Sequence, residues 1–136
     1  MTVTTIRVRY AETDRQGVAY HGHYFVWMEI GRTALLEELG FPYRRLEEEG
    51  LFFSVVAASC RYGGQALYDD RVEVRTTLTE VRSRAAVFGY ELSVGERRIA
   101  SGETTLIALD GERRPRRIPD SLARALRARL QSEPGR

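Results

Sequence analysis

With 136 residues, the chain has room for one packed domain and not for two ordinary ones. Its hydrophobic fraction of 43% and charged fraction of 29% are typical of a globular protein, and no apolar run approaches the roughly 18 residues of a membrane-spanning helix. The net charge of +2 is too small to indicate a nucleic-acid-binding protein. We therefore expect a single domain over residues 1–136, with no membrane span and no nucleic acid partner.

The first residues lack the charged-then-apolar order of a signal peptide. The lone cysteine, Cys60, cannot form an internal disulfide. Both observations favour a cytoplasmic protein. All 21 basic residues are arginine, which excludes Schiff-base chemistry on a lysine side chain.

The N-terminal third predicts a strand, a loop and a long helix. Residues 3–10 alternate apolar and polar side chains, the period-two pattern of a half-buried strand. Residues 11–22 are polar and contain glycine, which indicates a loop. Over residues 23–39, apolar side chains recur at helical spacing on nearly every side, so this helix should be enclosed by other elements. Gly40 is suited to follow its C-terminal end.

The remainder of the chain predicts a short helix at 42–50, four strands and a last helix. The strand-like runs cover residues 51–62, 70–82, 85–94 and 98–109. Turn-forming residues separate the runs, and such short connections favour antiparallel pairing between consecutive strands. An amphipathic helix follows at 119–131, with Pro119 in its first turn.

This order of elements predicts an α+β fold. One five-stranded antiparallel sheet would bury a face by wrapping around the long apolar helix, with the short C-terminal helix added. Such a layout resembles the hotdog fold. Long edge strands need covering, so we expect the sheets of two subunits to pair in a homodimer.

Candidate catalytic residues gather in the predicted loop. Both histidines, His21 and His23, follow Asp14 within nine residues, and Tyr20 lies between them and the acid. A carboxylate near imidazoles, just before a helix, suits general acid–base chemistry. A polar loop whose side chains cap the helix and one another explains the same residues, so the pattern alone leaves both interpretations open.

The loop and the start of the helix match a known motif. Its members here are Tyr10, Glu12, Thr13, Asp14, Gly17, Val18, Tyr20, His21, Tyr24, Met28, Glu29 and Arg32. In these residues the chain resembles the 4-hydroxybenzoyl-CoA thioesterase family of hotdog proteins, and more closely its bacterial branch associated with the Tol-Pal system. The similarity continues through Tyr62, Ala66, Asp69, Asp70, Val74 and residues 116–119.

The resemblance implies hydrolysis of an acyl-CoA thioester to a free acid and coenzyme A. Asp14 would attack the carbonyl or activate the attacking water. The backbone amide of His21 would polarise the carbonyl oxygen, a role that suits the positive end of a helix. With Tyr20, these are the candidate catalytic residues. The implied chemistry needs no metal or cofactor, because coenzyme A is part of the substrate.

Five further residues are candidates for substrate binding. Gln16 and Gly17 lie beside Asp14, and Gly17 would allow close approach of the backbone. His23 stands where the family often has asparagine, so it could alter pH dependence or acyl preference. Arg82 and Arg84 could bind the phosphates of coenzyme A through their forked donors, although a solvated surface charge explains either arginine equally simply.

Other interpretations of single residues are weaker. The spacing of His21 and His23 suits a metal, yet no further histidine or cysteine ligand is present to complete a usual site with Asp14. Cys60 lies in an apolar strand run, where a buried, inert thiol is expected. For Glu29, on the buried helix, we expect a structural pairing with Arg32.

Two other functions stay open beside thioester hydrolysis. One is hydration or dehydration of an acyl thioester, and the other is non-catalytic binding of acyl-CoA. Against the binding module, the chain shows no appended DNA-binding segment such as a hotdog regulator carries. For the assembly, the resemblance implies a tetramer built from two dimers, whereas sheet pairing by itself supports the dimer.

Overall fold

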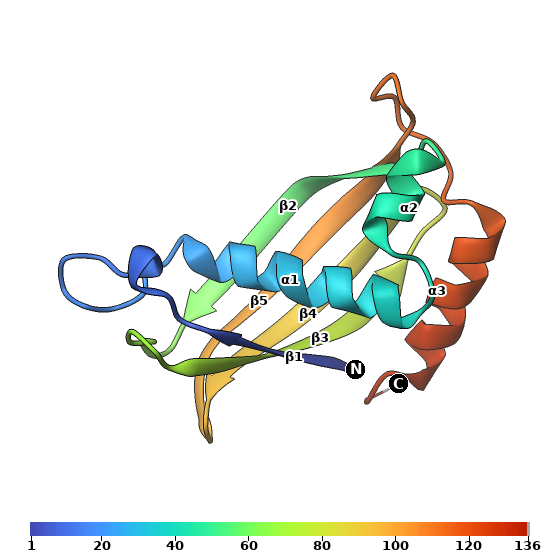
Figure 1. The fold of residues 1–136 in the computed structure, drawn as a ribbon. Helices are drawn as coiled ribbons and strands as arrows, with labels where there is room; N and C mark the ends of the chain where they lie inside the picture. Colours follow the sequence, from blue (N-terminus) through green and yellow to red (C-terminus); the bar gives the residue numbers. More distant parts are fainter. Residues whose placement is uncertain (136) are drawn as a thin grey trace.

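The computed structural model describes residues 1–135. Its strands are β1 (Thr2–Arg7), β2 (Phe52–Tyr62), β3 (Arg71–Val81), β4 (Ala85–Val94) and β5 (Arg97–Leu109), and its helices are α1 (His23–Glu38), α2 (Tyr43–Glu48) and α3 (Asp120–Ser132). One antiparallel sheet curves around α1, with α3 at one end of the molecule (Figure 1). The expected architecture is therefore confirmed.

The strand order in the sheet is β1-β3-β4-β5-β2. The strands β3, β4 and β5 pair consecutively, as the short turns predict. The expectation of pairing is wrong for β2 and β3, because residues 63–70 carry the chain from β2 to the opposite side of the sheet, where β3 lies between β1 and β4. β2 pairs only with β5 and β1 only with β3, so these two strands form the edges.

The first strand is shorter than predicted. β1 ends at Arg7, and a 3-10 turn at Tyr10–Glu12 then directs the chain into the loop. The N–H of Val8 donates to the carbonyl of Asp70 over 2.9 Å, which joins the end of β1 to the start of β3. At the other end of the chain, Pro119 precedes the first turn of α3 rather than lying in it.

The core is centred on α1. Trp27, Met28 and Leu35 are at most 1% exposed, and they pack with buried side chains from all of the long strands except β2. Gly31 lets the helix approach the sheet, because a Cβ there would lie 2.9 Å from Cγ1 of Val74. Each large apolar side chain buried in this way stabilises the fold by about 1.5–3 kcal/mol.

The edge strand β2 is poorly covered. Val55 and Val56 are 45% and 54% exposed, at an irregularity where the pairing of β2 with β5 shifts its register. Residues 57–59 are exposed as well. This strand therefore presents uncovered side chains on both faces together with an unpaired edge. None of the helices within residues 1–135 is long and apolar enough to cross a membrane.

Candidate active site

The loop that carries Asp14 is a tight hairpin. Thr13 and Ala19 pair across it, and the N–H of Asp14 donates to the carbonyl of Val18 over 2.8 Å. At the tip, the N–H of Gly17 donates to the carbonyl of Asp14 over 3.0 Å, and Gly17 has φ of +81°. This left-handed conformation favours glycine and accounts for the residue type at position 17 without reference to a substrate.

The side chain of Asp14 is exposed and partly oriented. Its Oδ1 accepts a hydrogen bond from the N–H of Gln16 over 2.8 Å, the local turn that aspartate commonly forms. Among residues 1–135, no donor contacts Oδ2 of Asp14. One carboxylate oxygen is thus held by the backbone, while the other is available to a substrate or a water molecule. Gln16 contributes through its main chain.

Glu12 attaches the hairpin to α1. Its side chain is buried, its Oε2 accepts from the indole N–H of Trp27 over 3.0 Å, and its Oε1 accepts from the N–H of Arg9 over 2.8 Å. Its backbone carbonyl accepts from the N–H of Tyr20 over 2.8 Å. Burial alone would raise the pKa of Glu12, but the donors on Arg9 and Trp27 outweigh it, so the pKa lies below its ordinary value.

The start of α1 presents two free backbone donors. Within the described residues, the N–H groups of His21 and Gly22 have no protein acceptor, whereas the N–H of His23 donates to the carbonyl of Tyr20 over 3.0 Å. The first N–H groups of a helix commonly lack partners and attract negative charge. These two amides, rather than the imidazole rings, are therefore the polar feature of this helix end.

Tyr62, at the end of β2, was not among the candidate site residues. Its hydroxyl donates to the carbonyl of His21 over 3.0 Å. Burial is the main cause that raises the pKa of Tyr62 to about 12, so the hydroxyl keeps its proton near neutral pH. The sequence places Tyr62 in a matching motif, but its contact with His21 depends on how β2 lies beside α1.

The candidate residues of the loop form one aromatic cluster. The ring of Tyr20 lies 4.5 Å from that of His21 and 5.9 Å from that of His23, between ring centroids. Tyr62 lies 5.7 Å from His21 on another side. A Cβ at Gly22 would lie 2.7 Å from the ring of Tyr20, so glycine is needed there for this packing. The structure thus brings Tyr20, His21 and His23 together beside the hairpin.

Arg82 and Arg84 lie elsewhere. They belong to the turn after β3, whereas the hairpin contacts residues that precede β3, and the eleven residues of this strand span about 33 Å. Arg82 forms an ion pair with Glu80, and the carbonyl of Ser83 accepts from the N–H of Ile118 near α3. Figure 1 shows the end of β3 near α3, away from the loop that precedes α1, so within one chain the two arginines are not brought to Asp14.

The structure also describes the surroundings of Cys60, of the possible metal ligands and of Glu29. Burial raises the pKa of the Cys60 thiol, which agrees with the expected inert cysteine. Residues 1–135 contain no group of three His, Cys, Asp or Glu side chains placed to hold a metal ion. The expected pairing of a buried Glu29 with Arg32 is wrong, because Glu29 is exposed and forms no ion pair within the described chain.

The match to a known family covers most of the chain. The sequence profile of the thioesterase-like superfamily matches residues 8–126. This chain belongs to the thioesterase-like superfamily. Its relatives include the acyl-CoA thioester hydrolase YbgC of Escherichia coli O6:H1, which is 30% identical over 119 residues, or 86% of this chain and 89% of that protein. YneP of Bacillus subtilis is 41% identical over 87 residues, or 64% of this chain and 63% of YneP.

A solved structure has the same fold as this chain. The crystal structure of the hypothetical protein TT1821 from Thermus thermophilus superposes with a TM-score of 0.92 at 41% identity, covering 95% of this chain and 99% of that one. The expected hotdog fold is thereby confirmed, and the names of the relatives support the expected class of thioester hydrolases. The match is to the superfamily as a whole, so the 4-hydroxybenzoyl-CoA branch with its Tol-Pal association stays a prediction.

Proposed function

We propose that this member of the thioesterase-like superfamily hydrolyses acyl-CoA thioesters to a free acid and coenzyme A, with Asp14 as its catalytic carboxylate. The observation that carries the proposal is the pair of unpartnered N–H groups of His21 and Gly22, beside the hairpin that presents Asp14. The name of YbgC, which aligns with 86% of this chain, supports the same reaction.

The two amides suit a developing oxyanion because neighbouring carbonyls fix their directions. In a trans peptide the N–H points opposite to the C=O of the same plane. The carbonyl of Tyr20, in the plane of the His21 N–H, accepts from His23. The carbonyl of His21, in the plane of the Gly22 N–H, accepts from Tyr62. Donors held in advance in this way stabilise a tetrahedral intermediate more than mobile donors do.

Asp14 supplies the other half of the reaction. As a nucleophile, its free oxygen would form an acyl anhydride as the thiolate of coenzyme A leaves, and water would then hydrolyse the anhydride. As a general base, Asp14 would take a proton from the water that attacks the thioester. Both routes need one unhindered carboxylate oxygen, and Oδ2 of Asp14 meets this need.

The test is release of free coenzyme A from a panel of acyl-CoAs, followed with a thiol reagent. Asp14→Asn keeps an oxygen that can accept from Gln16, so the hairpin should persist while activity falls by at least about a hundredfold. The matched control is Asp120→Asn on α3, which should retain wild-type rates. Unchanged release by Asp14→Asn would reject Asp14, and no release by the wild-type protein would reject hydrolysis.

A homodimer joined through β2 is part of the proposal. β2 has eleven residues, and no strand of the described chain pairs with its outer edge, where only Phe53 is bonded, to the hydroxyl of Tyr43. Its exposed valines would be buried if the same strand of a second subunit lay antiparallel to it. Sedimentation should therefore show a dimer that Val56→Arg dissociates. Val3→Arg changes a comparably exposed valine on the other edge strand and should leave the dimer intact; equal behaviour of both variants would reject pairing through β2.

A further inference from the structure

Two neighbouring hollows follow one side of α1. The first measures about 210 Å³ and lies near Phe25, Val26, Val55 and Ala58. The second measures about 200 Å³ and lies between α1, the sheet and the two shorter helices. Glu29 and Arg32 line both hollows, which are therefore adjacent at these side chains. In succession, the two hollows follow α1 from Phe25 to Leu36, a path along the helix.

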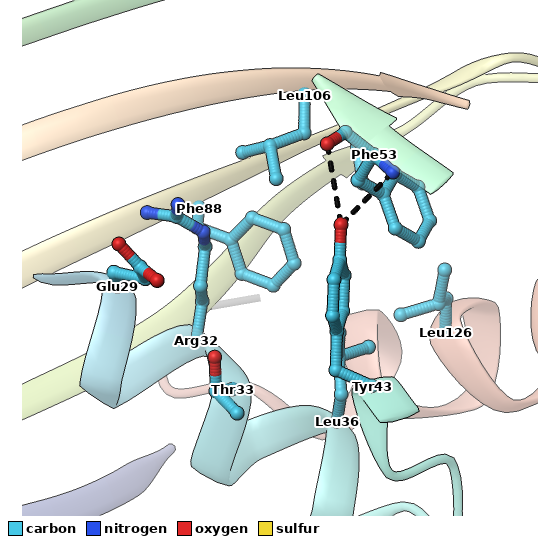
Figure 2. Close-up of a pocket in the computed structure, with 10 residues that line it drawn as sticks. Glu29, Arg32, Thr33, Leu36, Tyr43, Phe53, Phe88, Leu106 and Leu126 are labelled. Carbon is cyan, nitrogen blue, oxygen red and sulfur yellow. Dashed lines mark hydrogen bonds between the residues drawn. The ribbon is translucent and has the colours of Figure 1, made fainter. Parts of the chain in front are cut away.

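The second hollow has polar side chains from α1 on one side and buried apolar side chains on the other. Its innermost side chains are all at most 5% exposed: Leu36, Ala86, Phe88, Leu106 and Leu126. The hydroxyl of Tyr43 donates to the carbonyl of Phe53 over 3.2 Å and accepts from its N–H over 3.0 Å, which joins α2 to β2 beside the cavity. Figure 2 shows Glu29 and Arg32 at one end of the cavity and Leu126 at the other.

The path begins near the proposed oxyanion site. Phe25 and Val26 come one turn after His21 and Gly22, and Glu29 lies about 12 Å from His21 along α1 at 1.5 Å per residue. Leu36, in the inner hollow, lies about 22 Å from His21 on the same measure. A short acyl group bound at the amides cannot reach the inner hollow, whereas an extended long chain can.

We propose that the two hollows form the acyl-chain channel, and that the preferred substrates carry medium or long unbranched acyl chains whose methyl end lies in the inner hollow. This inference rests on the proposed thioesterase activity. The buried apolar side chains of the inner hollow would take up methylene groups and offer no partner to a polar terminus. The stems of Glu29 and Arg32 would flank the chain while their charged groups remain in water.

The decisive measurement is kcat/KM for straight-chain acyl-CoAs from butanoyl to hexadecanoyl. In the wild-type protein, kcat/KM should rise by roughly fourfold per methylene over the lengths that enter the inner hollow. Thr33→Phe places a ring in that hollow and should lower kcat/KM for dodecanoyl-CoA by at least about tenfold. The value of kcat/KM for butanoyl-CoA should not change. Thr33→Val keeps the volume of threonine and is the matched control.

A second variant enlarges the inner hollow instead of filling it. Phe53→Ala enlarges the inner hollow, and the bonds of residue 53 to Tyr43 survive because they use only the backbone. The preferred chain length should therefore increase. Circular dichroism confirms that each variant is folded. If Thr33→Phe and Phe53→Ala both keep the wild-type chain-length profile, or if butanoyl-CoA is the best substrate, the channel is overturned.

Measurements of acyl-CoA binding test the channel independently of the proposed catalysis. Calorimetry with the Asp14→Asn protein should show tighter binding of dodecanoyl-CoA than of butanoyl-CoA, and Thr33→Phe in the same background should remove the difference. Equal affinity for the two ligands would overturn the channel even if hydrolysis occurs. Conversely, a chain-length dependence of binding without hydrolysis by the wild-type protein would reject the thioesterase and keep the channel.

Discussion

The indole N–H of Trp27 donates to the carboxylate of Glu12 over 3.0 Å inside the protein. Glu12 is 4% exposed and Trp27 is 1% exposed. This bond connects the chain just before Asp14 with the middle of the second turn of α1. The carboxylate hairpin and the helix end that supplies the amides are therefore fixed to each other by a buried side-chain contact, not only by the intervening loop.

Glu12→Gln should destabilise the protein by about 1–3 kcal/mol, because an amide cannot accept on both sides and leaves one buried donor without a partner. Unfolding in urea measures the change. Glu96→Gln, in the exposed turn between β4 and β5, is the control and should have no effect. If Glu12→Gln leaves the urea midpoint unchanged, the hydrogen bonds of Glu12 make no net contribution to the free energy of unfolding.

The stability should fall in acid partly through Glu12. Its folded-state pKa is lowered from the ordinary value of 4.5, so the unfolded chain binds a proton first as the pH drops. The stabilisation is fully present above the unfolded pKa and is lost as pH falls through the folded pKa. Urea midpoints of wild type and Glu12→Gln should therefore differ near neutral pH and approach each other as the pH falls below 4.5. A constant difference across this range would contradict the assignment.

Gly31→Ala should destabilise the fold by about 1–3 kcal/mol through overpacking. The new methyl group would collide with Oγ1 of Thr76 and lie 2.9 Å from Val74 on β3. Gly111→Ala introduces the same methyl where nothing lies within 4 Å, and it should be neutral. The double variant Gly31→Ala/Thr76→Ala should recover part of the loss, since Thr76 Oγ1 is buried without a hydrogen-bond partner among the described residues.

Tyr62→Phe should lower kcat by about tenfold and leave KM nearly unchanged. The lost hydroxyl orients the peptide that carries the Gly22 N–H, a donor needed more in the transition state than in the ground state. Tyr68→Phe, which removes an exposed hydroxyl, is the matched control. A rise in KM at constant kcat would instead assign Tyr62 to substrate binding.

The sequence predicted most elements because their patterns are local. The strand-like run of residues 85–94 and the apolar run of α1 require nothing beyond neighbouring residues, and both appear with almost the expected bounds. The path of residues 63–70 across the sheet was missed, since a turn signal indicates that the chain bends and not which strand it meets next. Long-range contacts of residues 66–70 with residues 8–19 decide this path.

The sequence indicated which segment carries the candidate site, but not how the side chains of that segment are arranged in space. Asp14 and His21 were identified from their motif, but the pattern could not show that Glu12 is buried against Trp27 or that Tyr62 reaches His21. These contacts join residues 15 and 41 positions apart. For Arg82 and Arg84, the length of β3 separates them from the hairpin of the same chain, so phosphate binding by these arginines stays a prediction.

The bond pair between Tyr43 and Phe53 also limits how far the sheet can be extended. In an antiparallel strand, the N–H and C=O of one residue point to the same side. Both groups of Phe53 are occupied by a single hydroxyl, so the outer edge of β2 has no vacant bonding position there. A strand that paired with the outer edge of β2 would have to stop short of residue 53, so one tyrosine on α2 limits the length of β2 that is open to a second strand.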